Sequence, residues 1–595
     1  MAVTNYILVC GGTGCESAKA DAIYQNLIHA SQTEGVSETV QIVKTGCFGF
    51  CEQGPIVKIL PEDSFYVQVK PEDAEEIIKE HVVKGREVKR LLYNKDNSKK
   101  HAKVEDIQFY QKQFRIVLRN CGFINPEDIN EYIAREGYAA LEKVLFEMTP
   151  DDIISELKVS GLKGRGGAGF PTWLKWKFTK DIDDPVKYVV CNADEGDPGA
   201  YMDRSTLEGD PHSVLEAMTI AGYTTGANKG YIYIRAEYPL AINRLKLAME
   251  QAREYGLLGE NILDSGFSFD VDIRLGAGAF VCGEETALLT SLEGNRGMPK
   301  PRPPFPAVKG LWDQPTVINN VETWANIPVI ILRGGEWFAK IGTEDSKGTK
   351  VFALTGKIRN SGLVEVPMGT TLREIIFDIG GGIANDKEFK AVQTGGPSGG
   401  VITKEYLDTP IDYFHLQELG SMMGSGGMIV MDEDDCIVDV TKFYLGFTVD
   451  ESCGKCSPCR VGGRTLYNIL DRITKGKGEM DDIDKMRSVG HAMTKASLCG
   501  LGQTAPNPIL STLRYFEKEY HAHIKDKKCP SGKCKELISY YILADKCIGC
   551  AACARKCPVA AITGERRKIH RIDQDLCVKC GICYETCKFD AIYVG

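Results

Sequence analysis

Short apolar runs separated by Gly-rich turns open the chain, and this pattern predicts strands. The run from Tyr6 to Cys10 predicts a strand that leads into a turn, and residues 40–45 predict a second strand. A helix-like segment lies between them. Residues 1–90 are therefore expected to form a small domain. The polar, lysine-rich stretch that follows, residues 91–119, is expected to be a linker.

The next part of the chain combines apolar runs with a marked helix start. Thr149 precedes Pro150 and two acidic residues, a pattern typical of a capped helix. Residues 186–190 and 271–275 predict buried strands. Polar or Gly-rich segments follow both strands, where open α/β sheets bind their ligands. We therefore expect an α/β domain over residues 120–345.

The rest of the chain divides into three regions. Residues 346–430 alternate short strands with one helix, residues 431–525 have a mostly helical pattern, and residues 526–595 are rich in cysteine. The sequence thus predicts a multidomain protein of α/β and α+β type. A length of 595 residues is enough for about four domains or more.

Charge and hydropathy exclude several classes of function. The formal net charge is -9 and the sequence pI is about 5.7, so nothing favours a nucleic-acid partner. No run of about 18 apolar residues is present, which argues against a membrane span. The first residues lack the basic and apolar regions of a signal peptide. The protein is expected in the cytoplasm.

A Gly-rich segment, residues 161–172, is the first candidate for chemistry. Gly164, Gly166 and Gly169 match the G-x-G-x-x-G pattern, but a predicted helix precedes the segment where a Rossmann turn needs a strand. Backbone N–H groups beside Lys163 and Arg165 still suit a phosphate group. A flexible linker is the alternative interpretation.

The 22 cysteines fall mainly in closely spaced runs, which is typical of metal ligation and not of disulfides. The first set lies on two predicted turns and suits a 2Fe-2S cluster, with structural zinc as the alternative. The second set has two-residue spacing plus one distant cysteine and predicts a 4Fe-4S cluster. These sets are Cys10, Cys15, Cys47 and Cys51, and Cys453, Cys456, Cys459 and Cys499.

The C-terminal region repeats one cysteine pattern twice, with spacings of two, two and three residues. This pattern is typical of bacterial ferredoxins with two 4Fe-4S clusters, in which the fourth cysteine of each run binds the other cluster. A Cys-rich fold without iron is the alternative. The expected ligand sets are Cys547, Cys550, Cys553 and Cys587, and Cys577, Cys580, Cys583 and Cys557.

Six cysteines remain. Two of them, Cys529 and Cys534, precede the ferredoxin pattern and suit tetrahedral zinc together with His570, the fourth ligand being unidentified. A pair of idle thiols is the alternative. The other four are interpreted as buried small hydrophobes: Cys121, Cys191, Cys282 and Cys436.

Four short segments carry a family resemblance. Gly-Arg-Gly-Gly-Ala-Gly-Phe-Pro-Thr, Cys-Asn-Ala-Asp-Glu, Cys-Gly-Glu-Glu-Thr and Asn-Asn-Val-Glu-Thr follow one another in this order. Over roughly residues 120–520 the chain resembles the flavin subunit of NADH:quinone oxidoreductase, respiratory complex I. It also resembles relatives of that subunit in NAD-linked hydrogenases and formate dehydrogenases.

The resemblance implies a fold for each region. Residues 1–90 are similar to a thioredoxin-like 2Fe-2S ferredoxin, and residues 120–345 to a Rossmann-like domain that binds FMN and NADH. Residues 346–430 are similar to a ubiquitin-like domain. A helical 4Fe-4S bundle is implied for residues 431–525, and a two-cluster ferredoxin fold for residues 526–595.

The resemblance also implies the cofactor-binding residues. An FMN site is implied at Gly164, Arg165, Gly166, Gly167, Lys175, Asn192, Asp194, Glu195, Gly283, Glu284, Ile318, Asn319, Asn320 and Thr323. NAD(H) is implied at Phe170, Phe178, Asp197, Glu285, Arg302 and Phe305. No catalytic side chain is assigned, because hydride transfer needs positioning and electrostatics and no acid or base.

Two nucleotide-site residues depart from the family pattern. Asp197 stands where many relatives have Glu, and Arg302 where Lys is usual. A carboxylate near the ribose favours NADH over NADPH because it repels a 2′-phosphate. A guanidinium binds phosphate well, so Arg302 favours the opposite choice. NAD(H) is the expected nucleotide.

The combination of domains resembles the beta subunit of electron-bifurcating iron-only hydrogenases. That resemblance implies electron transfer between NAD(H), ferredoxin and a hydrogenase. The implied partners are an iron-only hydrogenase catalytic subunit, a small 2Fe-2S thioredoxin-like subunit and ferredoxin. One alternative is the flavin subunit of an NAD-dependent formate dehydrogenase. The other is an electron-transfer scaffold whose flavin site is silent.

Overall fold

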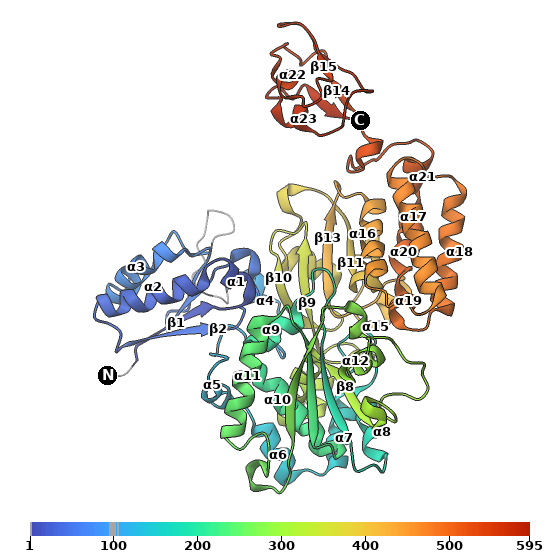
Figure 1. Cartoon of the computed structure of the whole chain (residues 1–595). Helices are drawn as coiled ribbons and strands as arrows, with labels where there is room; N and C mark the ends of the chain where they lie inside the picture. Colours follow the sequence, from blue (N-terminus) through green and yellow to red (C-terminus); the bar gives the residue numbers. More distant parts are fainter. Residues whose placement is uncertain (1–2, 94–102, 104–105) are drawn as a thin grey trace. The chain divides into compact units, whose positions relative to one another are not determined.

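The computed structural model describes residues 3–93, 103 and 106–595 (Figure 1). The chain forms two compact units, Met1–Val430 and Met431–Gly595. Among the described residues, no helix combines the length and the apolar character needed to cross a membrane.

The N-terminal domain is a four-stranded sheet with helices, drawn in blue in Figure 1. Its strands are β1 (Asn5–Cys10), β2 (Val40–Thr45), β3 (Val57–Leu60) and β4 (Ser64–Tyr66), in the order β2-β1-β3-β4. β1 is parallel to β2 and antiparallel to β3. Both strands predicted for this region are present. The helices are α1 (Thr13–Ser17), α2 (Ala20–Thr33) and α3 (Ala74–Glu76).

The predicted linker differs from a solvated connection in its second half. Residues 106–119 contain α4 (Gln108–Gln111), and the ring of Phe109 stacks on that of Phe50 with their centroids 4.3 Å apart. The carboxylate of Glu365 accepts three successive backbone N–H groups, from residues 116, 117 and 118, each at 2.9 Å. This stretch is therefore part of the core. Residues 94–102 and 104–105 of the predicted linker lie outside the described residues.

A parallel four-stranded sheet organises the predicted α/β domain. The strands β5 (Tyr188–Ala193), β6 (Lys229–Arg235), β7 (Asp270–Gly276) and β8 (Thr316–Asn320) follow the order β7-β6-β5-β8. All three pairs are parallel, so the four carboxyl ends share one edge. The helices are α5 (Ile129–Ile133), α6 (Ala139–Glu147), α7 (Pro150–Ser160), α8 (Thr172–Asp181), α9 (Met202–Gly209), α10 (Pro211–Thr225), α11 (Pro239–Glu254), α12 (Glu285–Leu292), α13 (Val321–Arg333) and α14 (Gly335–Ala339).

The predicted start of α7 is confirmed. Thr149 is its N-cap, Pro150 is its first residue, and Thr149 and Asp152 form a reciprocal capping box. At the other end Gly161 adopts a left-handed conformation with φ 65°, which ends the helix and begins the Gly-rich segment.

A five-stranded sheet follows in residues 349–432. It consists of β9 (Thr349–Gly356), β10 (Gly362–Pro367), β11 (Phe389–Thr394), β12 (Gly400–Thr403) and β13 (Gly427–Asp432), in the order β10-β9-β13-β11-β12. β9 is parallel to β13 and antiparallel to β10. Helical segments lie at Glu374–Ile379 and at α15 (Tyr413–Glu418). The expected mix of strands and helix is present, and the ubiquitin-like assignment stays a prediction.

The second unit begins with helices, as the sequence predicts. They are α16 (Ile437–Asp450), α17 (Gly463–Thr474), α18 (Asp481–Ala496), α19 (Gly500–Thr504), α20 (Asn507–Tyr515) and α21 (Glu517–Ile524). Two short antiparallel strand pairs follow. β14 (Tyr540–Ile542) pairs with β17 (Ile592–Val594), and β15 (Ile562–Thr563) pairs with β16 (Arg571–Ile572). The helices α22 (Ala552–Lys556) and α23 (Ile582–Thr586) contact each other.

Candidate functional sites

The carboxyl edge of the parallel sheet gathers the residues predicted to bind FMN. Cys191 and Asn192 at the end of β5 lie in register with Asn319 and Asn320 at the end of β8. Asn192 donates from Nδ2 to the carbonyl of Gly283, at 2.9 Å. The three motifs that end or follow β5, β7 and β8 therefore meet at one place, as expected for a ligand site in an open α/β sheet.

The Gly-rich segment folds back on itself beside this edge. Gly164 N–H donates to the carbonyl of Phe170 at 2.8 Å. A Cβ at Gly166 would lie 3.4 Å from the Cβ of Asn320, so the glycine lets the loop approach the end of β8 closely. Gly167 has φ 114°, a conformation that favours glycine. These features suit a cradle of backbone N–H groups and not a flexible linker.

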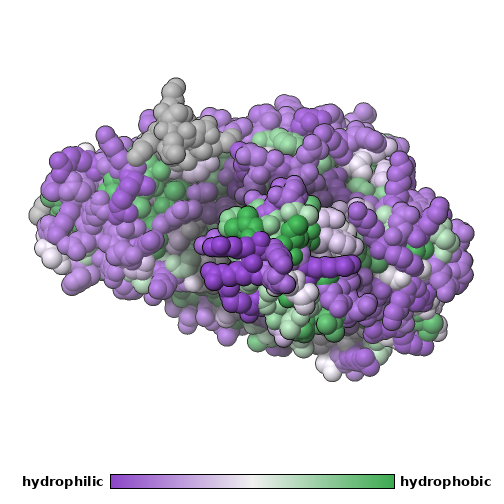
Figure 2. All heavy atoms as spheres, turned by 90° about the horizontal axis from the view of Figure 1, so that it is seen from above, coloured by the Kyte–Doolittle hydropathy of each residue, from purple (hydrophilic) through white to green (hydrophobic). Residues whose placement is uncertain are grey.

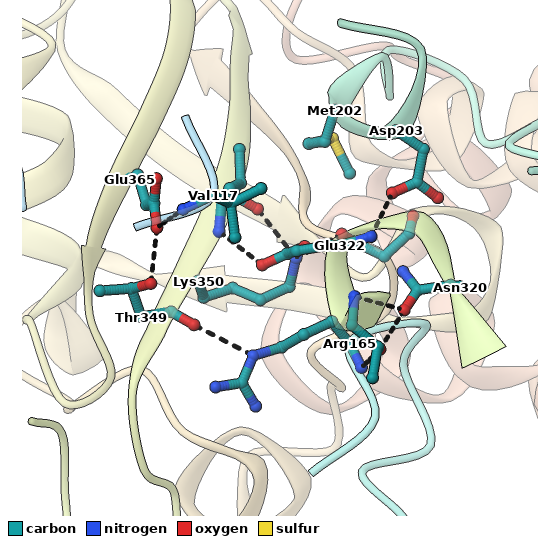
Figure 3. A network of polar contacts seen from close by, with 12 residues as sticks. Val117, Arg165, Met202, Asp203, Asn320, Glu322, Thr349, Lys350 and Glu365 are labelled. Carbon is teal, nitrogen blue, oxygen red and sulfur yellow. Dashed lines mark hydrogen bonds and ion pairs between the residues drawn. The ribbon is translucent and has the colours of Figure 1, made fainter. Parts of the chain in front are cut away.

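The side chain of Arg165 bonds to backbone carbonyls of the protein. It is fully buried and donates to the carbonyls of Thr349 at 3.0 Å, Lys163 at 3.0 Å and Lys347 at 2.5 Å (Figure 3). Its backbone N–H donates to Thr323 Oγ1 at 2.8 Å. Arg165 therefore ties the loop to β9 and α13, and its assignment to the FMN site stays a prediction. The backbone N–H groups of this loop are therefore the candidate ligands of a phosphate.

Two buried donors at this edge lack a partner within the described residues. They are Nδ2 of Asn320 and Nη1 of Arg235. Arg235 ends β6, and a Cβ at Gly196 would lie 2.3 Å from its Nη1. A buried polar group without a partner costs about 1–3 kcal/mol, so a ligand with acceptor atoms fits this place. Sequence reasoning missed Arg235, although its position at the end of a parallel strand is a usable signal.

The carboxylate of Glu195 is engaged by the start of α9. Its carboxylate accepts the N–H groups of Asp203 and Arg204, both at 3.1 Å, and so caps the start of α9. Burial raises the pKa of Glu195 to about 7. The hydroxyl of Tyr238 donates to the carbonyl of Glu195 at 2.8 Å and holds the loop from the other side.

The nucleotide candidates are charged or exposed aromatic residues. Phe170, Phe178 and Phe305 are exposed by 43%, 47% and 54%, so their rings are accessible to a ligand. Arg302 Nη1 lies 2.6 Å from Glu285 Oε1, and the guanidinium is 5.9 Å from the centre of the Phe305 ring. Exposed aromatic faces beside charged groups suit a nucleotide.

Lys175 and Asp197 lie deeper in the site. Lys175 Nζ donates to the carbonyl of Ile318 at 2.8 Å and lies 3.8 Å from Glu285 Oε2, and burial lowers the pKa of Lys175. Burial raises the pKa of Asp197 to about 6, and this carboxyl accepts a hydrogen bond from Ser425. Ser425 precedes β13, so the five-stranded sheet also contributes to this site.

A buried network of charged side chains connects the parallel sheet domain to the five-stranded sheet (Figure 3). Lys350 and Glu322 are 0% and 1% exposed and form an ion pair. Lys350 Nζ also donates to the carbonyl of Ser425 at 2.6 Å, and Glu322 accepts the N–H of Val351 at 2.9 Å. The backbone N–H of Glu322 donates to Asp203 Oδ1 at 3.3 Å. The Glu of the Asn-Asn-Val-Glu-Thr segment is thus a structural residue that joins the two sheets.

The four N-terminal cysteines lie on neighbouring loops. Cys10 ends β1, whose parallel neighbour β2 leads to Cys47. The Sγ atoms of Cys47 and Cys51 are 3.9 Å apart, and Gly49 N–H donates to Cys47 Sγ at 3.3 Å. A Cβ at Gly54 would lie 2.8 Å from Cys15 Sγ, so small residues make room for the thiols. The grouping suits a 2Fe-2S cluster.

The other cysteine runs are also gathered. Cys459 lies next to α19, because a Cβ at Gly502 would be 3.0 Å from Cys459 Cβ, and Cys499 is the N-cap of that helix. In the ferredoxin-type domain one hollow is lined by thiols of both runs. These are Cys557 from the first run and Cys577, Cys580 and Cys583 from the second. This grouping fits the predicted exchange of the fourth cysteine.

A different group of four candidate metal ligands replaces the predicted zinc set. Cys436, His523, Cys529 and Cys534 are buried, and their ligand atoms lie within 4.8 Å of one another. His523 Nε2 is 3.3 Å from Cys436 Sγ and 3.4 Å from Cys534 Sγ, while its Nδ1 faces the carbonyl of Glu519 at 2.7 Å. Three thiols and an imidazole whose second ring nitrogen is hydrogen-bonded to a backbone carbonyl fit tetrahedral zinc.

Two expectations about this site were wrong. His570 does not join the group, because it lies beside Gly564 with its Nδ1 3.1 Å from the carbonyl of Lys568. Cys436 is a member of the group and not an isolated buried hydrophobe. It precedes α16, nearly a hundred residues before Cys529, so spacing alone gave no signal for it.

Four regions of the chain match models of known protein families. The chain matches the Nuo51 FMN-binding domain over residues 157–329 and the NADH-ubiquinone oxidoreductase-F iron-sulfur binding region over residues 439–523. It matches a 4Fe-4S dicluster domain over residues 546–591 and a thioredoxin-like [2Fe-2S] ferredoxin over residues 2–82. The protein is a multidomain flavin and iron–sulfur oxidoreductase subunit.

Two individual proteins that are similar over most of their length identify the family. The chain is 61% identical over 482 residues to the NADP-reducing hydrogenase subunit HndC of Solidesulfovibrio fructosivorans, covering 81% of this chain and 98% of that protein. It is 45% identical over 415 residues to an NADH-quinone oxidoreductase subunit of Rhizobium meliloti strain 1021, covering 70% and 99%. The chain belongs to the family of flavin subunits that these NAD(P)-linked hydrogenases and NADH-quinone oxidoreductases share.

A solved structure supports the same grouping. An NAD+-reducing [NiFe]-hydrogenase in the H2-reduced state has a chain with a TM-score of 0.62 and 28% identity to this protein. The match covers 88% of this chain and 85% of that one.

Proposed function

We propose that this chain is the FMN-bearing NADH dehydrogenase subunit of a cytoplasmic, electron-bifurcating hydrogenase. It would pass electrons between NAD(H), ferredoxin and a hydrogenase catalytic subunit. The observation that carries the proposal is the sheet edge where Asn192, Asn320 and the Gly-rich loop meet, within a chain that also holds four cysteine sets.

The residues at the sheet edge fit FMN. The Gly-rich loop would hold the phosphate by its backbone, while Asn320 and Arg235 would donate to acceptor atoms of the cofactor. Lys175 and Glu195 would orient it from the buried side. Bound FMN would supply the exchange between the two-electron chemistry of a nicotinamide and the one-electron chemistry of the clusters.

The nucleotide would bind on the exposed aromatic residues Phe170, Phe178 and Phe305. We propose NAD(H), because Glu285 already pairs with Arg302 and the guanidinium is therefore engaged by a carboxylate. NADP(H) is the second candidate, favoured by the 61% identical NADP-reducing hydrogenase subunit. The ratio of kcat/KM for NADH and NADPH decides between them.

The cysteine sets would hold one 2Fe-2S cluster and three 4Fe-4S clusters, and Cys436, His523, Cys529 and Cys534 would hold zinc. Electrons would leave the flavin singly through the clusters. The proposed partners are an iron-only hydrogenase catalytic subunit, a small 2Fe-2S thioredoxin-like subunit and ferredoxin.

The test uses the complex purified without oxygen. Hydrogen is the donor, ferredoxin reduction is the readout, and NAD is added or left out. Ferredoxin reduction that requires NAD supports bifurcation at this flavin. NADH-dependent dye reduction with ferredoxin reduction that ignores NAD contradicts it, and formate is then tried as the donor. A purified complex without flavin absorbance would favour the silent scaffold.

A further inference from the structure

The loop between β5 and α9 contacts two candidate redox sites. It begins at the end of β5 with Glu195 and Asp197, which belong to the flavin and nucleotide site. It ends at Tyr201, whose hydroxyl donates to Cys51 Sγ at 3.5 Å. Cys51 is the exposed member of the N-terminal cysteine set, and the other three are buried. The flavin domain thus supplies a hydrogen bond to the one thiol of this set that faces solvent.

The two domains are fixed to each other around this contact. Glu208 in α9 is buried and accepts the N–H of Thr13 at 3.0 Å, inside the loop between Cys10 and Cys15. Arg244, 1% exposed, donates to the carbonyl of Glu208 at 2.6 Å and to that of Gly11 at 3.4 Å. Buried polar contacts of this kind define one geometry, because each partner would otherwise lose its hydrogen bond.

Close packing reinforces the polar contacts. A Cβ at Gly46 would lie 2.3 Å from the Cα of Gly209, so the second cysteine loop touches the end of α9 backbone to backbone. One apolar cluster joins part of the N-terminal domain to the five-stranded sheet. It contains Phe48 and Phe50, Phe109 of α4, and Phe352 and Val364 of the sheet. The cysteine loops are therefore held rigidly against the flavin domain.

Tyr201 is itself held in place. Its ring packs on the buried cluster that contains Leu118, Cys121 and Met202. The guanidinium of Arg204 lies 5.5 Å from the centre of the ring, on the same helix whose N-terminus Glu195 caps. Removing only the hydroxyl would leave this packing unchanged, which separates the hydrogen bond from the fold.

We propose that Tyr201 is a tuning residue of the N-terminal 2Fe-2S centre, so that the flavin domain sets the reduction potential of a cluster bound by another domain. A hydrogen bond to a ligand sulfur withdraws electron density and stabilises the reduced, more negative cluster. One electron enters the cluster and the Tyr201 proton stays on its oxygen. The inference rests on the proposed function, which places a 2Fe-2S cluster on Cys10, Cys15, Cys47 and Cys51.

The test is a redox titration of the anaerobically purified full-length protein, followed by the paramagnetic resonance signal of the reduced 2Fe-2S centre. The variant is Tyr201→Phe. The matched control is Tyr255→Phe, which removes an exposed hydroxyl that donates to Asn130 Oδ1 at 3.0 Å, away from the cysteine loops. The titration reports the potential without requiring turnover.

At a fixed potential near the midpoint, we expect Tyr201→Phe to lower the ratio of reduced to oxidised 2Fe-2S centre by up to about tenfold, which is 59 mV for a one-electron couple. The 4Fe-4S signals and the Tyr255→Phe protein should not shift. An unchanged 2Fe-2S potential in Tyr201→Phe overturns the inference, because solvent then replaces the hydroxyl. A wild-type protein without a 2Fe-2S signal overturns the cluster assignment in the proposed function.

Discussion

The N-terminal and C-terminal cysteine sites have opposite surroundings. Three of the four N-terminal thiols are buried, and side chains of the flavin domain contact their loops. In the ferredoxin-type domain Cys550 and Cys580 are exposed, and their neighbours Ile548 and Val578 are exposed by 55% and 57%. One face of the molecule, drawn in Figure 2, shows small groups of green hydrophobic residues among purple hydrophilic ones. The first site is contacted by another domain of its own chain, whereas the second exposes two of its eight thiols and apolar side chains beside them to solvent.

The contrast explains how each region keeps its shape. The N-terminal and flavin regions depend on buried polar contacts between domains. The ferredoxin-type domain has only short strands and two short helices, and its apolar core is continuous with that of the helices before it. A region with so little regular structure depends on bound ligands for its stability. We therefore expect substitutions at the candidate metal site that precedes it to have the largest effect.

The largest expected effect is the loss of the proposed zinc ion. In Cys436→Ser or His523→Ala, zinc should fall from one per chain to none, because each change removes one of four ligands. Structural zinc contributes on the order of 10 kcal/mol to the folding of small domains, so unfolding of residues 431–595 should occur at a lower temperature. Metal analysis of the purified protein and thermal unfolding measure this.

Two matched variants sharpen that result. His521→Ala changes an exposed histidine on the same helix, and His570→Ala changes the histidine that the sequence suggested. Both should retain zinc. Loss of zinc in His570→Ala with retention in His523→Ala would show that the geometric grouping is wrong.

The second prediction concerns the buried ion pair in the first unit. Lys350→Met leaves the carboxylate of Glu322 buried without its cation, which costs about 3–5 kcal/mol. Chemical unfolding should show residues 1–430 destabilised, while the iron–sulfur absorbance of the ferredoxin-type domain persists to higher denaturant. Lys112→Met is the control, since its ion pair with Asp378 is exposed and screened by solvent, so its loss should change stability far less. Equal losses in the two variants would contradict the assigned role of the pair.

The third prediction is a pH dependence that belongs to the flavin region. Burial raises the pKa of Glu195 from its ordinary value of 4.5 to about 7, so the folded state holds an extra proton between these pH values. Its contribution to stability is therefore present at low pH and is lost as the pH rises through 7, by about 3 kcal/mol at most. Asp203 and Asp197, whose pKa values burial also raises, act in the same direction.

Glu195→Gln tests this because it removes the titration while keeping the shape of the side chain. The free energy of unfolding measured from pH 5 to pH 8 should fall less steeply with pH in the variant than in the wild type. Glu254→Gln, at an exposed position on α11, should keep the wild-type slope. An identical slope in Glu195→Gln would mean that Glu195 is already ionised at pH 5.

Sequence reasoning succeeded where the signal is local. The capping pattern at Thr149 and the two N-terminal strands were predicted from neighbouring residues, and the structure confirms them. The spacing of the ferredoxin cysteines likewise predicted which thiols of the second run would share a hollow with Cys557. For the cap and the strands, the residues that decide the structure lie within a few positions of one another.

Sequence reasoning failed where partners are far apart in the chain. Cys436 meets His523 because α16 and α21 contact each other, and no spacing rule relates the two residues. The family resemblance placed Arg165 in the FMN site, and sequence reasoning gave no sign that its side chain donates to the carbonyl of Thr349 in the five-stranded sheet. The linker prediction missed the burial of Phe109, since its partner Phe50 lies far upstream.

The smallest expected effect lies at the exposed apolar surface of the ferredoxin-type domain. Val578 follows Cys577 directly, lines the hollow that contains four thiols and is 57% exposed, so Val578→Ser removes little buried surface. The change in stability should stay within about 0.5 kcal/mol.

If this surface meets an external electron carrier, Val578→Ser should lower the rate of ferredoxin reduction a few-fold. NADH-dependent dye reduction, which depends on the flavin, should be unchanged. Val308→Ser, at a 49% exposed position in the flavin domain, is the matched control and should leave ferredoxin reduction unchanged. A fall in both rates for Val578→Ser would instead place this cluster on the path of every electron that leaves the flavin, and the contrast between an internal and an external site would then fail.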